Sequence, residues 1–475
     1  MIAALRSRLS ALELATRPVH PDTEEALRKR WAELPDHVKH DAQCLGRRTA
    51  GCEGTHGVFP RCDLACTPCY HSRDANRVRV DGEHTLNEID AQMAYLREQR
   101  GPGQYAQLIG GEVTLLSPED HADALAVMRK HGRKPMSMSH GDFDYDYLER
   151  LAIGPDGKPR FDSLSFAGHF DSMMYGRRGI KRARDERELN PYRKRFCEMF
   201  QQLEREHGVK HYLAHNMTVT PRNLAQVAQV VADCRHMGFR MFSFQPAAFI
   251  GNTNRWKDDY EELTGEKVWA EAERGAGGHL PWNMFQIGDE RCNRTAYGVY
   301  VGDRYVQLLD DRDPRDIEVR DAFFEAFGGM DFEHPRPLLA AKLARVFWRY
   351  PRGLGVLARW AGRFVRRAGL VPLLRHGAQP ITVVMHSFMD AKDVRPAWQG
   401  LQRGEISDDP RIRATQERLQ SCSYAMSHPE SDVLVPACVQ HSVLDPQENI
   451  KLMELLPLAE DEPATVGAAS GNGHG

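Results

Sequence analysis

Three cysteines within eight positions are the residues whose types and spacing best suit chemistry. Cys62, Cys66 and Cys69 lie in the segment RCDLACTPCYH and follow the pattern CxxxCxxC. Thiolates are soft ligands that suit iron–sulfur clusters, and three of them leave one iron of a [4Fe–4S] cube without a protein ligand. The spacing therefore predicts a cluster that can bind a small molecule at its open iron.

A zinc ion is the simplest alternative occupant of these cysteines. Structural zinc sites take four ligands, usually as two separated pairs. Three cysteines in one short loop fit that arrangement poorly, so the iron–sulfur cluster is the favoured interpretation.

A second motif, Gly110-Gly111-Glu112, ends the next apolar run of the chain. CxxxCxxC after a first strand and GGE after a second together resemble the radical S-adenosylmethionine (SAM) superfamily. The resemblance implies an enzyme whose [4Fe–4S] cluster cleaves SAM reductively to a 5′-deoxyadenosyl radical. That radical attacks an unactivated C–H bond of the substrate.

The resemblance also implies roles for single residues around SAM. Gly110 and Gly111 would let the backbone approach the methionine part of SAM, and Glu112 would help to bind its ammonium group. Members of the superfamily usually carry an aromatic residue just before the last cysteine. Pro68 occupies that position here, so Tyr70, two residues further on, is the candidate for stacking on the adenine.

Polar side chains at the ends of later apolar runs are further candidates for contact with SAM or substrate. The alternative for each is that it only satisfies neighbouring backbone groups. His140, Asp142 and Asp144 could also suggest a metal site, but no second ligand cluster accompanies them. The candidates are His140, Asp142, Asp144, Ser165, His169, His215, Asn216 and Gln245.

The elements that must position these residues alternate between short apolar runs and longer helical patterns, as in repeated β–α units. We expect an α/β fold with a partial (β/α)6 barrel, in which ligands bind at the carboxyl ends of the strands. Strands are expected at 57–59, 106–111, 134–140, 163–170, 211–219 and 240–246. Helices are expected at 85–99, 118–131, 143–152, 191–207 and 221–237.

The whole chain divides by composition into six segments. A helical, cysteine-bearing segment comes first, and the barrel follows it. An irregular charged segment then connects and covers the barrel mouth, before basic amphipathic helices and a cysteine-bearing extension. The last segment is small, polar and expected to be disordered. In chain order the segments are 1–53, 54–250, 251–333, 334–377, 378–457 and 458–475.

The other seven cysteines fall into two groups. Cys197 and Cys234 lie in helical patterns and are expected to be small core residues. The remaining five lie in loop-like contexts and could bind an auxiliary iron–sulfur cluster, as in many radical SAM enzymes; ordinary unligated thiols are the alternative. These five are Cys44, Cys52, Cys292, Cys422 and Cys438.

A basic belt without Asp or Glu runs from His334 to Met389. Its apolar residues recur at helical spacing, so one or two amphipathic helices, broken at Pro351 and Pro372, are expected. Such helices suit an anionic membrane surface, although a helix pair docked on the barrel is equally compatible. The basic residues of the belt include Lys342, Arg345, Arg349, Arg352, Arg359, Arg363, Arg366, Arg367 and Arg375.

Segments 242–252, 291–303 and 384–391 are loosely similar in pattern and order to tetraether lipid synthases, a branch of radical SAM enzymes that act on lipid chains. In that branch a corresponding region carries auxiliary-cluster cysteines. Cys292, Cys422 and Cys438 are the matching ligand candidates, although this chain has fewer cysteines than that branch usually has.

Bulk composition narrows the class of protein. The formal net charge of -3 gives no global attraction for nucleic acid, and the belt matches no nucleic-acid-binding motif, so no nucleic-acid partner is expected. The start of the chain carries arginines within its apolar pattern and predicts a helix rather than a secretory signal. Ten cysteines without such a signal favour a reducing cytoplasm.

The leading hypothesis is therefore a cytoplasmic radical SAM enzyme that acts on a lipid chain. Peripheral attachment to the inner face of the membrane is a further hypothesis. The resemblance also implies an electron donor of the flavodoxin or ferredoxin type. Two other hypotheses remain: a radical SAM enzyme that acts on a peptide or small metabolite, and an iron–sulfur sensor or electron carrier.

Overall fold

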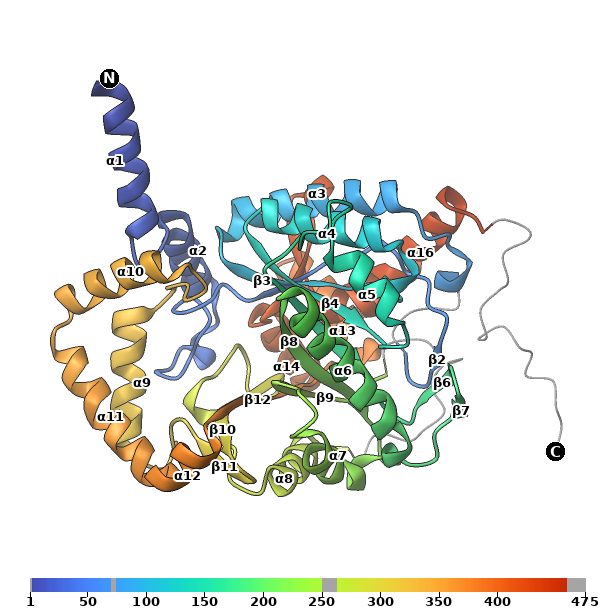
Figure 1. Ribbon diagram of the computed structural model, residues 1–475. Helices are drawn as coiled ribbons and strands as arrows, with labels where there is room; N and C mark the ends of the chain where they lie inside the picture. The colour runs from blue at the N-terminus through green and yellow to red at the C-terminus, as the bar shows by residue number, and fades with distance from the viewer. Residues whose placement is uncertain (1, 70–73, 250–262, 459–475) are drawn as a thin grey trace.

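A computed structural model describes residues 2–69, 74–249 and 263–458 of the chain (Figure 1). Eleven of its strands form one curled sheet, in the order β11-β10-β12-β9-β8-β5-β4-β3-β1-β13-β14. The strands of this sheet are β1 (Cys52–Gly54), β3 (Gln104–Leu108), β4 (Arg133–Ser139), β5 (Ser163–His169), β8 (Lys210–Val219), β9 (Met241–Pro246), β10 (Asn293–Val301), β11 (Arg304–Gln307), β12 (Gln379–His386), β13 (Tyr424–His428) and β14 (Val433–Pro436).

Eight neighbouring strands of the sheet, from β13 through β1 to β12, run parallel. Antiparallel β14 lies beyond β13, and antiparallel β10 and β11 lie beyond β12. The expected α/β fold on a curved, mainly parallel sheet is confirmed. Six strands was too few, because segments after residue 250 add strands at both sides of the sheet.

Helices between the parallel strands pack on the sheet, as Figure 1 shows for α3 and α4 above it. The sequence at both ends of α4 explains its length. At the start, the Ser117 hydroxyl accepts a hydrogen bond from the Asp120 N–H at 3.0 Å, and Pro118 occupies the first turn. Just after the end, Gly132 has a φ of +71°. These helices are α3 (Gly82–Arg100), α4 (Pro118–Lys130), α5 (Tyr145–Ala152), α6 (Asn190–His207) and α7 (Val227–Cys234).

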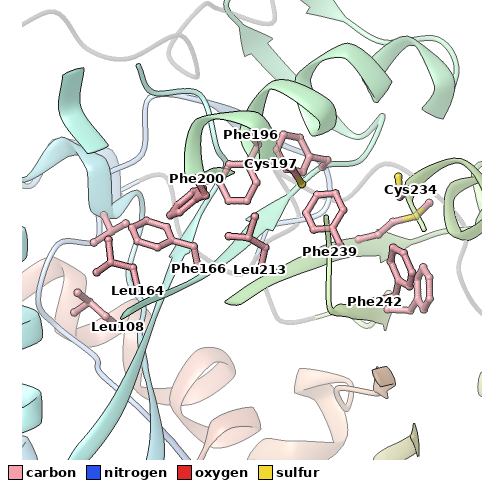
Figure 2. Packing of buried hydrophobic residues seen from close by; sticks show 14 of the residues in the cluster. Leu108, Leu164, Phe166, Phe196, Cys197, Phe200, Leu213, Cys234, Phe239 and Phe242 are labelled. Atoms are coloured by element: carbon pink, nitrogen blue, oxygen red, sulfur yellow. The ribbon is translucent and has the colours of Figure 1, made fainter. Parts of the chain in front are cut away.

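The main core lies between the sheet and these helices, and Figure 2 shows part of it. Phe166 of β5 packs against Phe200 of α6 with ring centroids 4.9 Å apart. Cys197 and Cys234 are fully buried in the same cluster, so the prediction that they are core residues is confirmed.

The first strand was predicted at 57–59, and the prediction is wrong, because β1 begins and ends before it. Val58 and Phe59 are buried in the core but belong to a loop, in which their carbonyl oxygens accept hydrogen bonds from Thr85 Oγ1 and the Gly111 N–H. An apolar run signals burial, and only the ladder partners decide whether the run is a strand.

The expectation that residues 251–333 form an irregular segment is also wrong for the part that the structure describes. This part contains α8 (Gly265–Ala276), β10, β11 and α9 (Pro314–Phe327). β10 pairs with β12 from Asn293 to Tyr300, so the segment extends the sheet.

The basic belt is helical, as predicted, and forms α10 (Arg336–Arg349), α11 (Arg352–Ala368) and α12 (Leu370–His376). The first break falls at Pro351 as expected. The second falls at Gly369, whose φ of +82° ends α11, and not at Pro372, which lies in the first turn of α12.

The amino-terminal segment and the carboxy-terminal extension complete the fold. Apart from Leu458, the predicted disordered tail 458–475 lies outside the described residues, as does Tyr70. In the part of the chain that the structure describes, no helix is both long and apolar enough to cross a membrane. The remaining helices are α1 (Ile2–Thr16), α2 (Pro21–Glu33), α13 (Ala391–Gln402), α14 (Pro410–Gln420), α15 (Ala437–Val439) and α16 (Asp445–Leu455).

Candidate active site

The loop that carries the three clustered cysteines is held by a small separate sheet, β2 (Ala65–Cys66), β6 (Met174–Arg177) and β7 (Ile180–Arg182). Cys66 pairs with Met174 across this sheet, and the Thr67 N–H donates to the Met173 carbonyl at 3.1 Å. The Cys62 N–H donates to the Asn76 side chain at 3.2 Å. The backbone between the cysteines is therefore fixed from outside the loop.

The GGE motif crosses the same loop at close range. The Gly111 N–H donates to the Phe59 carbonyl at 2.7 Å, and the Glu112 N–H donates to the Arg61 carbonyl at 2.8 Å. A Cβ at residue 111 would lie 1.9 Å from the Arg61 carbonyl oxygen, and one at residue 110 would lie 2.6 Å from the Phe59 ring. Glycine is required here because the segment before Cys62 occupies the space of a side chain.

Glu112 is almost fully buried, and its carboxylate accepts four hydrogen bonds. The donors are the Thr114 N–H at 3.1 Å, the Thr114 hydroxyl at 2.6 Å, the Ser139 hydroxyl at 2.8 Å and the His140 N–H at 2.8 Å. These bonds join the segment after β3 to the end of β4. In this arrangement the carboxylate positions the backbone, and contact with the ammonium group of SAM stays a prediction.

His140 connects this carboxylate to the cysteine loop. Its Nδ1 accepts the Asp142 N–H at 3.0 Å, so its Nε2 hydrogen donates to Asp63 at 2.7 Å. Burial lowers the pKa of His140, but the carboxylates of Glu112 and Asp63 outweigh it, and the net direction is upward. Burial and the Glu112 carboxylate raise the pKa of Cys62 well above its usual value. Metal binding at Cys62 therefore has to release the thiol proton.

Arg177 places a buried cation beside the loop. Its Nη2 donates to the carbonyls of His140 at 2.8 Å and His169 at 3.3 Å. Its Nε and Nη1 are buried and have no hydrogen-bond partner among the described residues. Burial lowers its pKa, against the opposing effect of Asp142 and of the Cys66 sulfur. Such N–H groups suit an anionic ligand at the cysteines.

A cavity of about 210 Å³ opens on the inner face of the sheet. Alternate residues of each strand line it, as the two-residue period of a strand requires. Its lining extends from Pro68 and Cys69 of the cysteine loop to the first residues of β9 and β13. Most of the surface is apolar and comes from Ile109, Met136, Met138, Ala167, Met241, Ala247, Phe388 and Met389.

Three of the predicted SAM or substrate contacts line this cavity: His169, Asn216 and Gln245. Gln245 donates to the Ser243 hydroxyl at 2.7 Å, and its buried Oε1 has no hydrogen-bond partner among the described residues. That oxygen is an acceptor available to a ligand. Ser165 lies on the same face of β5 but is not part of the lining.

Other predicted candidates have structural partners instead. His215 faces the core, where its Nε2 accepts from Arg193 at 2.9 Å, and burial lowers its pKa well below its usual value. Asp142 and Asp144 both bind Arg178. The prediction that these three contact a ligand is not supported. His215 lies on the core face of its strand, and the two aspartates bind a surface arginine.

Four of the five other loop cysteines meet around the cavity, from segments far apart in sequence. Cys44 does not line it and is buried near the Ala42 carbonyl, 3.9 Å from its sulfur. Burial raises the pKa of the thiols of Cys292 and Cys438 to about 11 and about 12 respectively. The four that line the cavity are Cys52, Cys292, Cys422 and Cys438.

Arg418 of α14 is a charged residue of this group that no sequence motif singles out. Its Nε lies 3.1 Å from the Cys292 sulfur, and its Nη2 donates to the Ser387 carbonyl at 3.0 Å. A guanidinium bound to sulfur favours thiolate over thiol. The signal that could have identified it is its position four residues before Cys422.

The described residues fit the group that the sequence predicts. Three thiols of one rigid loop can ligate three irons of a [4Fe–4S] cluster. The unpartnered N–H groups of Arg177 suit an anionic ligand beside it, and the Gln245 oxygen suits a donor such as the ammonium group of SAM. The cavity offers room on the Cys69 side for a further, apolar ligand.

Comparisons with known proteins give a weak fold likeness. No protein-family model and no curated protein match the chain. Solved structures that it resembles include native anSMEcpe, an anaerobic sulfatase-maturating radical SAM enzyme, with bound AdoMet, at 16% identity and a TM-score of 0.32. A complex of the same enzyme with AdoMet and the Kp18Cys peptide has 16% identity and a TM-score of 0.31.

The first alignment covers 46% of this chain and 57% of anSMEcpe, and the second covers 46% and 58%. The chain thus spans little more than half of these structures. At such identities and TM-scores the likeness carries no inference about chemistry, which depends on the site itself.

Proposed function

We propose that this protein is a radical SAM enzyme that functionalises an unactivated C–H bond of an apolar chain. The observation that carries the proposal is the loop of Cys62, Cys66 and Cys69, whose start is hydrogen-bonded to the GGE motif and whose Cys69 lines a mainly apolar cavity. When bound, the cluster and SAM supply a 5′-deoxyadenosyl radical that can remove hydrogen from carbon.

The residues of the chain have three tasks in this proposal. The cysteines ligate the cluster, and Arg177 offers N–H groups to an anionic ligand beside it. Asn216 and Gln245 orient polar groups of SAM or substrate from the ends of β8 and β9. The apolar lining excludes water, which protects a reactive intermediate from side reactions.

The composition of the cavity supports a lipid chain as the substrate, in line with the similarity to tetraether lipid synthases. Its methionines are flexible and polarizable, so they adapt to a long, featureless chain. A peptide would bury many backbone hydrogen-bonding groups against a lining whose surface is mainly apolar, although polar side chains stand within it. A peptide or small-metabolite substrate is therefore the second candidate.

We also propose a second metal centre, most simply an iron–sulfur cluster, at Cys52, Cys292, Cys422 and Cys438. Thiols from four separate segments meet there, and Arg418 balances the negative charge that ligated thiolates would carry. Its electrons, and those of the first cluster, would come from a flavodoxin- or ferredoxin-type donor.

The chemistry is tested by anaerobic reconstitution with iron and sulfide, followed by addition of dithionite and SAM. We expect 5′-deoxyadenosine from the wild-type chain and from the matched control Cys234→Ala, whose cysteine is in the core. Cys66→Ala is expected to form none. Equal product from Cys66→Ala and wild type would contradict the proposal. A cluster whose spectrum does not respond to SAM would instead favour a sensor or electron carrier.

The substrate class is tested with perdeuterated acyl lipids in the same assay. Hydrogen abstraction from the chain places deuterium in 5′-deoxyadenosine. Deuterium that appears only with labelled peptides or metabolites would select the second candidate.

The second centre is tested by iron analysis of the double variant Cys292→Ala/Cys438→Ala. Two clusters of one kind predict that iron per chain falls by about half. Cys44→Ala, a loop cysteine outside the cavity, serves as the control and is expected to keep all of its iron. Unchanged iron in the double variant would overturn the second centre and leave the first untouched.

A further inference from the structure

Helices α10, α11 and α12 carry large apolar side chains that are open to solvent. Figure 1 shows the three helices following one another around the left margin of the molecule. Trp348 of α10 is 90% exposed, and Val371 and Leu374 of α12 are 72% and 79% exposed. Leu354, Leu357 and Leu370 are about half exposed or more. Several large apolar side chains exposed on successive helices favour an interaction site.

One face of α11 packs on the rest of the protein. Arg363 and Arg367 both bind the buried carboxylate of Asp316, the former at 2.8 Å. The Trp360 indole N–H donates to the Leu308 carbonyl at 2.9 Å. The exposed residues of α11 therefore do not belong to the face that packs on the protein, because that face already has its partners.

The arginines on the outer face are different. No carboxylate of the described residues lies within 4.0 Å of Arg349, Arg352, Arg359, Arg366 or Arg375. No Asp or Glu occurs between residues 334 and 389 that could neutralise them locally. Exposed apolar groups and cations without an ion-pair partner therefore occur together on α10, α11 and α12. That pairing matches a layer with anionic headgroups above hydrocarbon.

We propose that the exposed residues of α10–α12 bind the surface of an anionic lipid bilayer. The Trp348 indole suits the headgroup level, where amphipathic aromatic rings gather. Leu370, Val371 and Leu374 enter the acyl boundary, and the outer arginines bind phosphate groups. The proposal rests on the proposed function and deepens it by naming the partner that would present an apolar chain to the enzyme.

Vesicle flotation tests this proposal with the full-length chain. The probes are phosphatidylcholine vesicles and vesicles that also contain phosphatidylglycerol. We expect binding to the anionic vesicles alone, and weaker binding at high salt, because salt screens the arginines. No binding to anionic vesicles at low salt would overturn the proposal, and equal binding to both kinds would remove the role of the arginines.

Matched variants locate the surface. Trp348→Ser/Leu374→Ser and Arg359→Glu/Arg366→Glu are each expected to lower the vesicle partition coefficient at least tenfold. Ile406→Ser removes an apolar residue that is 56% exposed elsewhere, and Arg205→Glu reverses an exposed charge on α6. These controls are expected to bind like wild type. Equal losses in the controls would contradict the assignment.

Two further outcomes are decisive. If the same variants convert a dimer to a monomer in sedimentation analysis, the surface binds a second copy of the chain, and the bilayer assignment is wrong. Flotation needs neither cluster nor SAM. Its failure therefore leaves the 5′-deoxyadenosine assay as an independent test of the proposed function.

Discussion

Gly111→Ala tests the claim that the crossing of the GGE motif and the cysteine loop shapes the cluster site. The added Cβ would lie 1.9 Å from the Arg61 carbonyl oxygen and 2.3 Å from its carbon. Both are backbone atoms, so no side-chain rotation relieves the clash. The loop before Cys62 has to move away from the end of β3.

The size of the effect follows from the strain of the added methyl group and from the hydrogen bonds that the movement breaks. Overpacking at a buried site costs about 1–3 kcal/mol. Separation of the two segments also breaks the Gly111–Phe59 and Glu112–Arg61 backbone hydrogen bonds, each worth about 0.5–1.5 kcal/mol. We expect a total of about 2–6 kcal/mol, either as lower stability or as a displaced loop that no longer holds Cys62 in place.

Two measurements separate these results: iron and sulfide per chain after reconstitution, and the thermal midpoint of the apo chain. The control is Gly362→Ala, because nothing lies within 4 Å of a Cβ at that position of α11. It is expected to stabilise the helix by about 0.5–1 kcal/mol and to leave iron unchanged. The reasoning fails if Gly111→Ala keeps both the iron content and the midpoint of wild type.

Two other predictions concern the scaffold. Arg193→Met leaves the buried Glu186 carboxylate without the guanidinium 2.6 Å away. The free energy of unfolding in urea should fall by about 3–5 kcal/mol and should partly recover in Glu186→Gln/Arg193→Met. An unchanged free energy of unfolding would refute a buried ion pair. Burial lowers the pKa of His121 to about 3. Because its unfolded pKa is near 6.5, the unfolded chain binds the proton first, and acidification from pH 7 to 5 should cost about 2 kcal/mol through this residue. His121→Gln should reduce the fall in the free energy of unfolding between pH 7 and pH 5. If that fall is unchanged in the variant, another residue is responsible for it.

Much of the fold was predictable because its signals are local. The runs at 134–140, 163–170 and 211–219 became β4, β5 and β8 with ends shifted by one residue at most. Ser117 and Gly132 bounded α4 as their capping chemistry requires. The failure at 57–59 arose because hydrophobicity reports burial, whereas strand formation depends on a ladder partner that is distant in sequence. Within 251–333, β10 likewise depends on its pairing with β12.

The candidate site divides in the same way. Asn216 and Gln245 line the cavity, but His215, next to Asn216, faces the core because adjacent strand residues point to opposite faces. Arg177 and Arg418 were not predicted, since they matter through contacts with residues that are distant in sequence. Arg177 reaches the cysteine loop only through the pairing of β6 with β2.

The sequence by itself predicted the first ligand set, because three thiols within eight positions need no distant segment to bring them to one cluster. Only the tertiary structure decided which other cysteines meet. β13 pairs with β1, and β12 pairs with β9, so residues near 52, 292, 422 and 438 surround one cavity while Cys44 stays outside it. Strand order is set by the packing of the whole sheet, and no local spacing encodes it.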